Sequence, residues 1–374
     1  AERDEREIAL LIGLGSVVMQ LHGWGAQEVE QAYARARELA GKHGALAQQF
    51  SANWNLWVAR VARGRVDQAQ DLALTLFDLG CRSTESSMLL QGHHACWTTS
   101  FVAGNLADTV KHTAEGIGLY SVEADGALIN AFGSHDTGVC ARIFHGRSAA
   151  LAGQARTALR CATEAITLAR ELGHPFTLAF ALTHAAAVNV ELHNAGAARA
   201  LALQATDVAR EQAFSLLQAW ATGFLGAAVV EDGEMGEGLT LLQEALAAAR
   251  ATGSTMFQPH LLTLLAAALL KGGCFADTQR TLDDAFELIG RSGERCYIAE
   301  LHRLSGELAL TSRAGADSRR LAERDLRTAI DIATQQGANL LALKAAISLA
   351  RLRSADADGE TLRLVAEARA RITE

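Results

Sequence analysis

The chain has 374 residues and a formal net charge of −8, and 49% of its residues are hydrophobic although only 5% are aromatic and two are proline. No Lys/Arg run exceeds short pairs such as Arg319-Arg320, which argues against DNA or RNA as the main partner because nucleic-acid-binding domains carry a basic patch. Ala and Leu, both strong helix formers, supply most of the apolar residues, and this composition predicts an all-α fold.

The ends of the chain and its cysteines bear on its cellular setting. The first seven residues are mostly charged, no apolar run reaches the roughly 18 residues of a membrane span, and none of the six cysteines forms a C-x-x-C pair. We therefore expect a cytoplasmic location without membrane contact. The missing initiator Met, and a C-terminus within a helical pattern, lead us to expect a piece of a longer protein.

The expected elements begin with two helices near 3–22 and 26–43. Eight helical hairpins then follow in chain order, with helices near 45–63 and 65–80, 85–103 and 105–120, 135–152 and 154–172, 176–193 and 195–213, 215–232 and 234–252, 256–272 and 274–292, 295–312 and 317–336, and 339–353 and 358–373. Between 121 and 134 about nine extra residues interrupt the pattern. We predict that this inserted loop is the most specialised one, because long insertions in compact repeats are usually functional or disordered.

Two series of small residues recur at a period of about 40 residues. The second-helix series lies on the second helix of each hairpin and contains Ala36, Leu76, Gly116, Ala165, Ala205, Ala245, Ala285 and Ala329. The first-helix series contains Gly146, Ala186, Gly226, Ala266 and Gly306. One small side chain at a fixed position of each helix lets neighbouring helices approach closely, while Leu and Val fill the rest of the seam.

A third series marks the turn inside each hairpin. It contains Gly64, Gly104, Gly153, Gly233 and Gly273, with His193 once in place of Gly. Glycine suits this position because helices often end in the left-handed conformation, which penalises a Cβ atom. The three series predict one tetratricopeptide (TPR)-like α-solenoid, a right-handed superhelix of about nine hairpins. It would form a single domain over 1–374, with N-terminal repeats at 1–120 and C-terminal repeats at 135–374.

Several separated phrases make the chain resemble a known family. They are Glu28–Leu39, His135–Val139, Ala169–Phe176 and Glu300–Leu308. In this order they are similar to the C-terminal TPR region of bacterial multidomain regulators. Such regulators carry a class III adenylate/guanylate cyclase, a DNA-binding domain or a kinase, followed by a STAND-type signalling ATPase. The resemblance implies a sensor or scaffold arm that keeps an attached ATPase inactive until a ligand or partner binds.

The chain also departs from that family. Thr137 stands where the family phrase usually has Pro, and no G-x-x-x-x-G-K-[ST] phosphate loop is present. The paired metal-binding aspartates of a cyclase are also missing. The cyclase and ATPase activities therefore do not transfer to this chain, for which we expect no enzymatic activity and no cofactor.

In a TPR solenoid the first helices of the hairpins line the concave groove. Trp offers a large rigid surface there, and Arg offers a planar fork for carboxylates. The alternative is that such residues pack between layers or are solvated. The predicted groove residues are Trp54, His94, Arg147, Trp220, His260, Glu300, Arg303 and Glu307.

Other polar groups have simpler explanations. His93 and His94 are adjacent on a helix and point about 100° apart, so with Cys96 they predict no metal site. Asp136 is expected to cap the helix that follows it. Cys140 and Cys161 lie on paired helices, where buried free thiols are more common than a disulfide.

Three functions remain open at this point. The first is a regulatory module that binds a protein, a peptide or its own upstream ATPase or cyclase domains through the groove, with possible homo-oligomerisation through an end repeat. The second is a small-molecule sensor that closes on its ligand beside 121–133. The third, a hydrolase built on paired helices, is disfavoured because no set of convergent carboxylates can be assembled from the repeats.

Overall fold

The computed structural model describes residues 2–22, 27–129, 132, 134–312, 316–353 and 359–373, and in these ranges all regular structure is helical. The helices are α1 (Glu2–His22), α2 (Gln27–His43), α3 (Leu46–Ala62), α4 (Val66–Arg82), α5 (Ser86–Ala103), α6 (Leu106–Leu119), α7 (Val122–Asp125), the 3-10 turn η1 (Gly126–Leu128), α8 (Thr137–Leu151), α9 (Ala155–Leu172), α10 (Pro175–Glu191), α11 (Ala195–Glu211), α12 (Ser215–Glu231), α13 (Met235–Ala251), α14 (Gln258–Lys271), α15 (Phe275–Ser292), α16 (Ile298–Ser312), α17 (Ala316–Gln336), α18 (Asn339–Leu352) and α19 (Gly359–Ala370).

The helices pack in consecutive antiparallel pairs, which confirms the predicted all-α, TPR-like succession of hairpins. Most boundaries agree with the expected ranges to within two residues. The starts of α14 and α16 are later than expected. Phe257, which precedes α14, adopts a left-handed φ of 59°. The amides of Arg295 and Cys296 donate to the carbonyl of Val102 near the end of α5, so the chain is not yet helical at Arg295 and Cys296.

Both small-residue series lie inside the helix seams, as predicted. Ala165, Ala205, Ala285 and Ala329 have no exposed surface. At Gly226 a Cβ atom would lie 2.9 Å from the carbonyl oxygen of Gly238 on the partner helix. Packing of α12 on α13 at this distance therefore requires glycine.

The turn series also behaves as predicted. Gly64, Gly104 and Gly153 have φ values of 60°, 84° and 81°. His193 adopts a φ of 56° at the equivalent turn, so the replacement keeps the left-handed turn despite its Cβ atom. These turns let each second helix fold back along the first.

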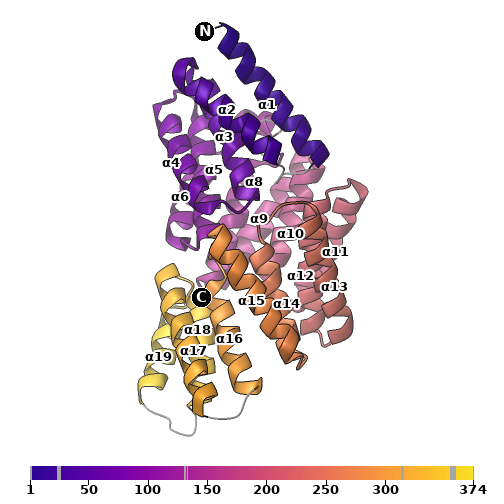
Figure 1. Ribbon diagram of the computed structural model, residues 1–374, viewed down its shortest axis with the longest axis vertical. Helices are drawn as coiled ribbons and strands as arrows, with labels where there is room; N and C mark the ends of the chain where they lie inside the picture. The colour runs from indigo at the N-terminus through magenta and orange to yellow at the C-terminus, as the bar shows by residue number, and fades with distance from the viewer. Residues whose placement is uncertain are drawn as a thin grey trace.

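The solenoid coils tightly enough for successive turns of the superhelix to touch. The Thr255 amide donates to the Ala62 carbonyl at 2.8 Å, and the Arg295 amide donates to the Val102 carbonyl at 2.7 Å. Figure 1 shows the result, with the orange and yellow C-terminal helices returning beside the purple N-terminal hairpins. The chain therefore completes one turn between α3 and α14, and the returning segments cover part of the concave side.

The inserted segment packs against α3 through Phe132. Its described part contains α7, η1 and Phe132, whose ring contacts Trp54 edge-on at 5.2 Å between centroids. Residues 130, 131 and 133 of the predicted 121–134 loop lie outside the described residues. Among the helices of the described ranges, none has both the length and the apolarity needed to cross a membrane.

Candidate ligand-binding groove

A cavity of about 810 Å³ lies on the concave side. Its wall comes from α3, α5, α8, α10, α12, α13 and the loop 252–257. Eight of the chain's 20 Phe, Trp and Tyr residues line it, which concentrates a scarce residue class in one place. We call it the aromatic chamber, and these eight residues are Trp54, Trp57, Phe144, Phe176, Phe180, Phe214, Trp220 and Phe257.

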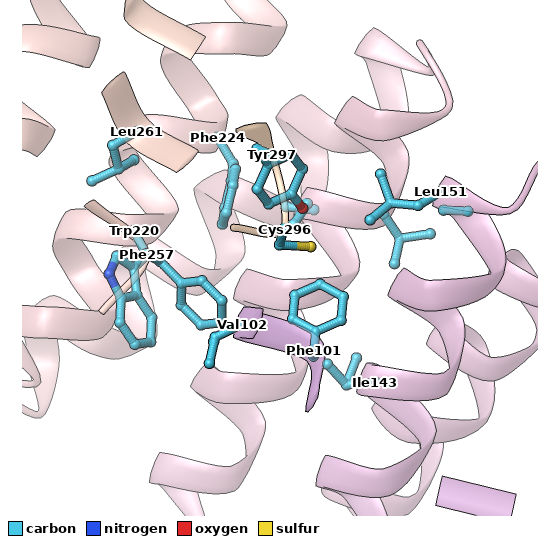
Figure 2. Packing of buried hydrophobic residues seen from close by; sticks show 14 of the residues in the cluster. Phe101, Val102, Ile143, Leu151, Trp220, Phe224, Phe257, Leu261, Cys296 and Tyr297 are labelled. Carbon is cyan, nitrogen blue, oxygen red and sulfur yellow. The ribbon is translucent and has the colours of Figure 1, made fainter. Parts of the chain in front are cut away.

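The returning loop forms part of the wall of the aromatic chamber. The Ser254 hydroxyl donates to the Ala62 carbonyl at the end of α3, at 3.1 Å, beside the bond made by the Thr255 amide. Phe257 of the same loop lies 5.1 Å from Trp220 between ring centroids. Figure 2 shows these two rings side by side, with Phe101 directed toward Cys296 of the next returning loop. The position of this loop in the chamber wall thus depends on contacts between residues far apart in the sequence.

Two polar groups in the chamber wall lack hydrogen-bond partners among the described residues. They are the Thr98 hydroxyl and the Trp220 indole N–H, and each residue is only 5% exposed. A buried polar group without a partner costs about 1–3 kcal/mol. Their position therefore favours a ligand that accepts hydrogen bonds as well as filling apolar space.

Arg147 lies at one end of the aromatic chamber and has no exposed side-chain surface. Its guanidinium donates to the Tyr297 hydroxyl at 2.6 Å and lies 3.3 Å from a carboxylate oxygen of Glu191. The same group is within 3.4 Å of ring nitrogens of His184 and His260. These five residues form the Arg147 cluster, which joins α8, α10, α14 and the segment before α16.

Burial sets the protonation of the cluster. The pKa values of His184 and His260 are lowered well below the ordinary value, first by burial and then by the Arg147 charge. Both imidazoles are therefore neutral and can accept from Arg147. Burial raises the pKa of Tyr297 far above its usual range, so its hydroxyl stays neutral and donates to Glu191. Burial also raises the pKa of Glu191, whereas the Arg147 charge and the Tyr297 hydroxyl favour its ionised form, so the cluster pairs the buried Arg147 cation with this carboxyl group.

A second, smaller cavity of about 210 Å³ lies on the other side of the Arg147 cluster. We call it the polar pocket. The cluster residues Glu191, His260 and Tyr297 form part of its wall. Four other charged side chains also line the pocket, namely Glu231, Glu300, Lys271 and Lys344. The first helices of successive hairpins thus line two cavities, one rich in aromatic side chains and the other mixing charged with aliphatic side chains.

The structure distributes the sequence-predicted groove residues among these features. Trp54, His94 and Trp220 line the aromatic chamber, whereas His260 and Glu300 line the polar pocket. Arg147 lines neither cavity and instead bonds to Glu191 and Tyr297. The role of the predicted groove residues in binding remains a prediction.

The remaining two predicted residues form a separate network on α16. Arg303 bonds to Glu300 at 2.6 Å and to Glu307 at 2.5 Å, and Glu307 also accepts from the Ser348 hydroxyl. Arg303 is therefore already engaged with two carboxylates.

The smaller predictions also have outcomes. Asp136 caps α8 by accepting from the Val139 amide at 2.8 Å, as predicted. His93 and Cys96 face away from His94: the first pairs with His112 and the second donates to the Ala73 carbonyl. The structure instead places His94 beside Cys140 and His135 in the chamber wall. Sequence reasoning missed this grouping and most of the Phe lining.

No family model matches the sequence, and no curated protein matches it significantly. Solved structures do share its fold. A Rap protein complexed with the competence and sporulation factor is 11% identical with a TM-score of 0.67, covering 98% of both chains. NprR in complex with its cognate peptide NprX is 12% identical with a TM-score of 0.57, covering 98% of both. Aspartyl phosphate phosphatase F from Bacillus subtilis is 10% identical with a TM-score of 0.52, covering 98% of this chain and 94% of that one. At these identities the likeness shows the fold alone, and that fold is a TPR-like α-solenoid.

Proposed function

We propose that the chain is a non-catalytic regulatory module that binds a short, largely apolar peptide in the aromatic chamber. The observation that carries the proposal is the chamber itself, which combines an aromatic wall with the two unpartnered donors of Thr98 and Trp220. An apolar peptide offers side chains that pack on the aromatic wall and backbone carbonyls that accept hydrogen bonds from the two donors.

Two further observations support this proposal. Two of the similar structures were solved with a bound factor or peptide. The aromatic chamber has no Asp or Glu among its described lining residues, whereas hydrolysis by acid/base pairs needs convergent carboxylates. What the module regulates remains a prediction from the sequence resemblance, which implies an attached ATPase or cyclase.

The test is a thermal-shift screen of the purified chain against short apolar peptides, with metabolites and nucleotides in parallel. A ligand that binds only the folded state raises the melting temperature. We expect peptides to raise it, and we expect Thr98→Val and Trp220→Phe to weaken the response. Thr183→Val is the matched control, because the Thr183 hydroxyl is also buried and unpartnered but lies outside the chamber lining. Equal loss in the control variant would contradict chamber binding.

A small apolar molecule is the second candidate ligand. The chamber's 810 Å³ falls within the roughly 300–1,000 Å³ of small-molecule sites, and the loop 252–257 forms part of its wall. Phe132 of the inserted segment packs on the chamber residue Trp54, as a ligand-responsive insertion would. A shift by metabolites and none by peptides in the same screen would favour this candidate.

A further inference from the structure

Three potential metal ligands meet in the wall of the aromatic chamber. They are His94 on α5, His135 just before α8 and Cys140 on α8, and their ligating atoms all lie within 4.8 Å of one another. The His94 Nε2 atom is 3.3 Å from the Cys140 Sγ atom. Two atoms bound to one ion at about 2.0–2.3 Å lie at most roughly 4.5 Å apart, so small side-chain adjustments suffice for a shared ion.

Outer hydrogen bonds hold His94 in the orientation that a ligand needs. The Gln91 side-chain oxygen is 3.0 Å from His94 Nδ1, and the Gln91 amide nitrogen donates to the Thr137 hydroxyl at 2.7 Å. With its proton on Nδ1, His94 donates to Gln91 and turns the lone pair of Nε2 toward Cys140. Metal-binding histidines characteristically make such a second hydrogen bond.

The other two ligands are also held in place. The His135 ring stacks on Phe180 with 4.4 Å between centroids and 10° between planes. Between His135 and Cys140, Asp136 caps α8 through the Val139 amide, and its own amide donates to the Thr177 hydroxyl at 3.0 Å. The backbone that carries both ligands is therefore fixed at the start of α8.

We propose that His94, His135 and Cys140 bind a Cu(I) ion. A thiolate with two imidazoles is a soft donor set of the kind that selects Cu(I) or Zn(II). One thiolate exactly neutralises a monovalent ion, whereas Zn(II) would leave a net charge in an apolar wall, where an unpaired charge costs several kcal/mol. A structural zinc site also has four protein ligands, whereas the described residues supply three.

The surroundings of His94 fit an uncharged complex. Trp54, Trp57 and Trp97 lie 5.1, 5.8 and 4.9 Å from the His94 ring between centroids. Binding transfers the Cys140 thiol proton to solvent as the Cu–S bond forms, and the copper stays monovalent, so no oxidant or reductant takes part. The remaining open side of the ion faces the chamber.

The test is a competition for Cu(I) between the chain and the chromogenic chelator bicinchoninate, without oxygen. We expect the chain to withdraw one equivalent of Cu(I), and we expect Cys140→Ser to lower the affinity at least 100-fold. Gln91→Leu should lower it about 10–100-fold through the loss of orientation. Cys161→Ser is the matched control, since Cys161 is a buried thiol outside the chamber, and it should bind like the wild type.

Further measurements keep the proposal falsifiable should Cys140→Ser fail to fold. X-ray absorption of the wild-type complex should show one sulfur and two nitrogen neighbours at copper. Failure to withdraw Cu(I), an equal loss in Cys161→Ser, or retention of Zn(II) in preference to Cu(I) would each overturn the assignment. Because the probes are the metal ions Cu(I) and Zn(II) alone, these outcomes do not depend on whether a peptide binds the chamber.

Discussion

The two cavities of the solenoid are built from equivalent helices but differ in their aromatic and charged lining residues. The aromatic chamber is large, has a mostly aromatic wall and no lining carboxylate among the described residues. The polar pocket is about a quarter of its volume and is lined by Glu191, Glu231, Glu300, Lys271 and Lys344. The same small-residue series supports both. The repeat therefore determines how helices pack, and the inward-facing positions independently determine what each interior can bind.

The largest effect is expected where the two interiors meet. Arg147→Met removes the cation that separates them and leaves Glu191 as an uncompensated buried anion. We expect a loss of about 3–5 kcal/mol in the free energy of unfolding, measured by urea denaturation. The double variant Arg147→Met/Glu191→Gln should recover much of this loss. A small loss for the single variant would mean that the cavities do not depend on the Arg147 cluster.

Glu294, in the segment that returns before α16, should make the free energy of unfolding depend on pH. Burial raises the pKa of Glu294 to about 8, although the Phe257 amide and the Arg147 charge favour its ionised form. In the unfolded chain the pKa of the Glu294 carboxyl is near 4.5. Between about pH 4.5 and 8 the folded state therefore binds more protons than the unfolded state. Stability should therefore fall as pH rises, by up to about 1.4 kcal/mol per pH unit.

Glu294→Gln isolates this contribution, because its amide oxygen can still accept from Phe257. Urea denaturation at several pH values from 5 to 8 should show the variant gaining stability relative to the wild type with each step. Parallel profiles for the two proteins would show that Glu294 does not titrate in this window.

A substitution in the shared scaffold should affect both interiors alike. Gly226→Ala places a Cβ atom 2.9 Å from the Gly238 carbonyl and 3.0 Å from Leu241, which should cost about 1–3 kcal/mol. Gly236→Ala is the matched control in the facing helix, where an added Cβ meets nothing within 4 Å. It should be neutral or stabilising by up to about 1 kcal/mol. Equal thermal shifts for the two variants would argue against close helix approach at Gly226.

The smallest effect concerns the rim of the aromatic chamber. Ala213 lines the chamber and has a left-handed φ of 56°. Ala213→Gly should stabilise the chain by about 0.5–1 kcal/mol, because the Cβ penalty exceeds the extra entropy that glycine loses on folding. A lower melting temperature for Ala213→Gly would show that the methyl group contributes to the rim.

The fold could be predicted because its determinants are local and repeated. Ala165, Gly226 and the turn glycines recur at one period, and each acts on the adjacent helix. The chamber could be predicted only in part. Trp54, His94 and Trp220 follow from their place on first helices, but Phe257 depends on a loop that returns from the next superhelical turn. Likewise His94 lies 41 residues before His135 and 46 residues before Cys140, so no spacing rule identifies the three residues as a group.

The contacts between superhelical turns also change how the molecule should unfold. In an open solenoid each repeat touches only its neighbours, and stability is a sum of local terms. Here hydrogen bonds join residues 187 and 193 positions apart, such as Ala152 with Asn339 and Ala62 with Thr255. Contacts so distant in sequence raise the contact order and slow folding. They also couple α3 and α18 to the central helices, so that local unfolding at either of these helices reaches contacts in the middle of the chain.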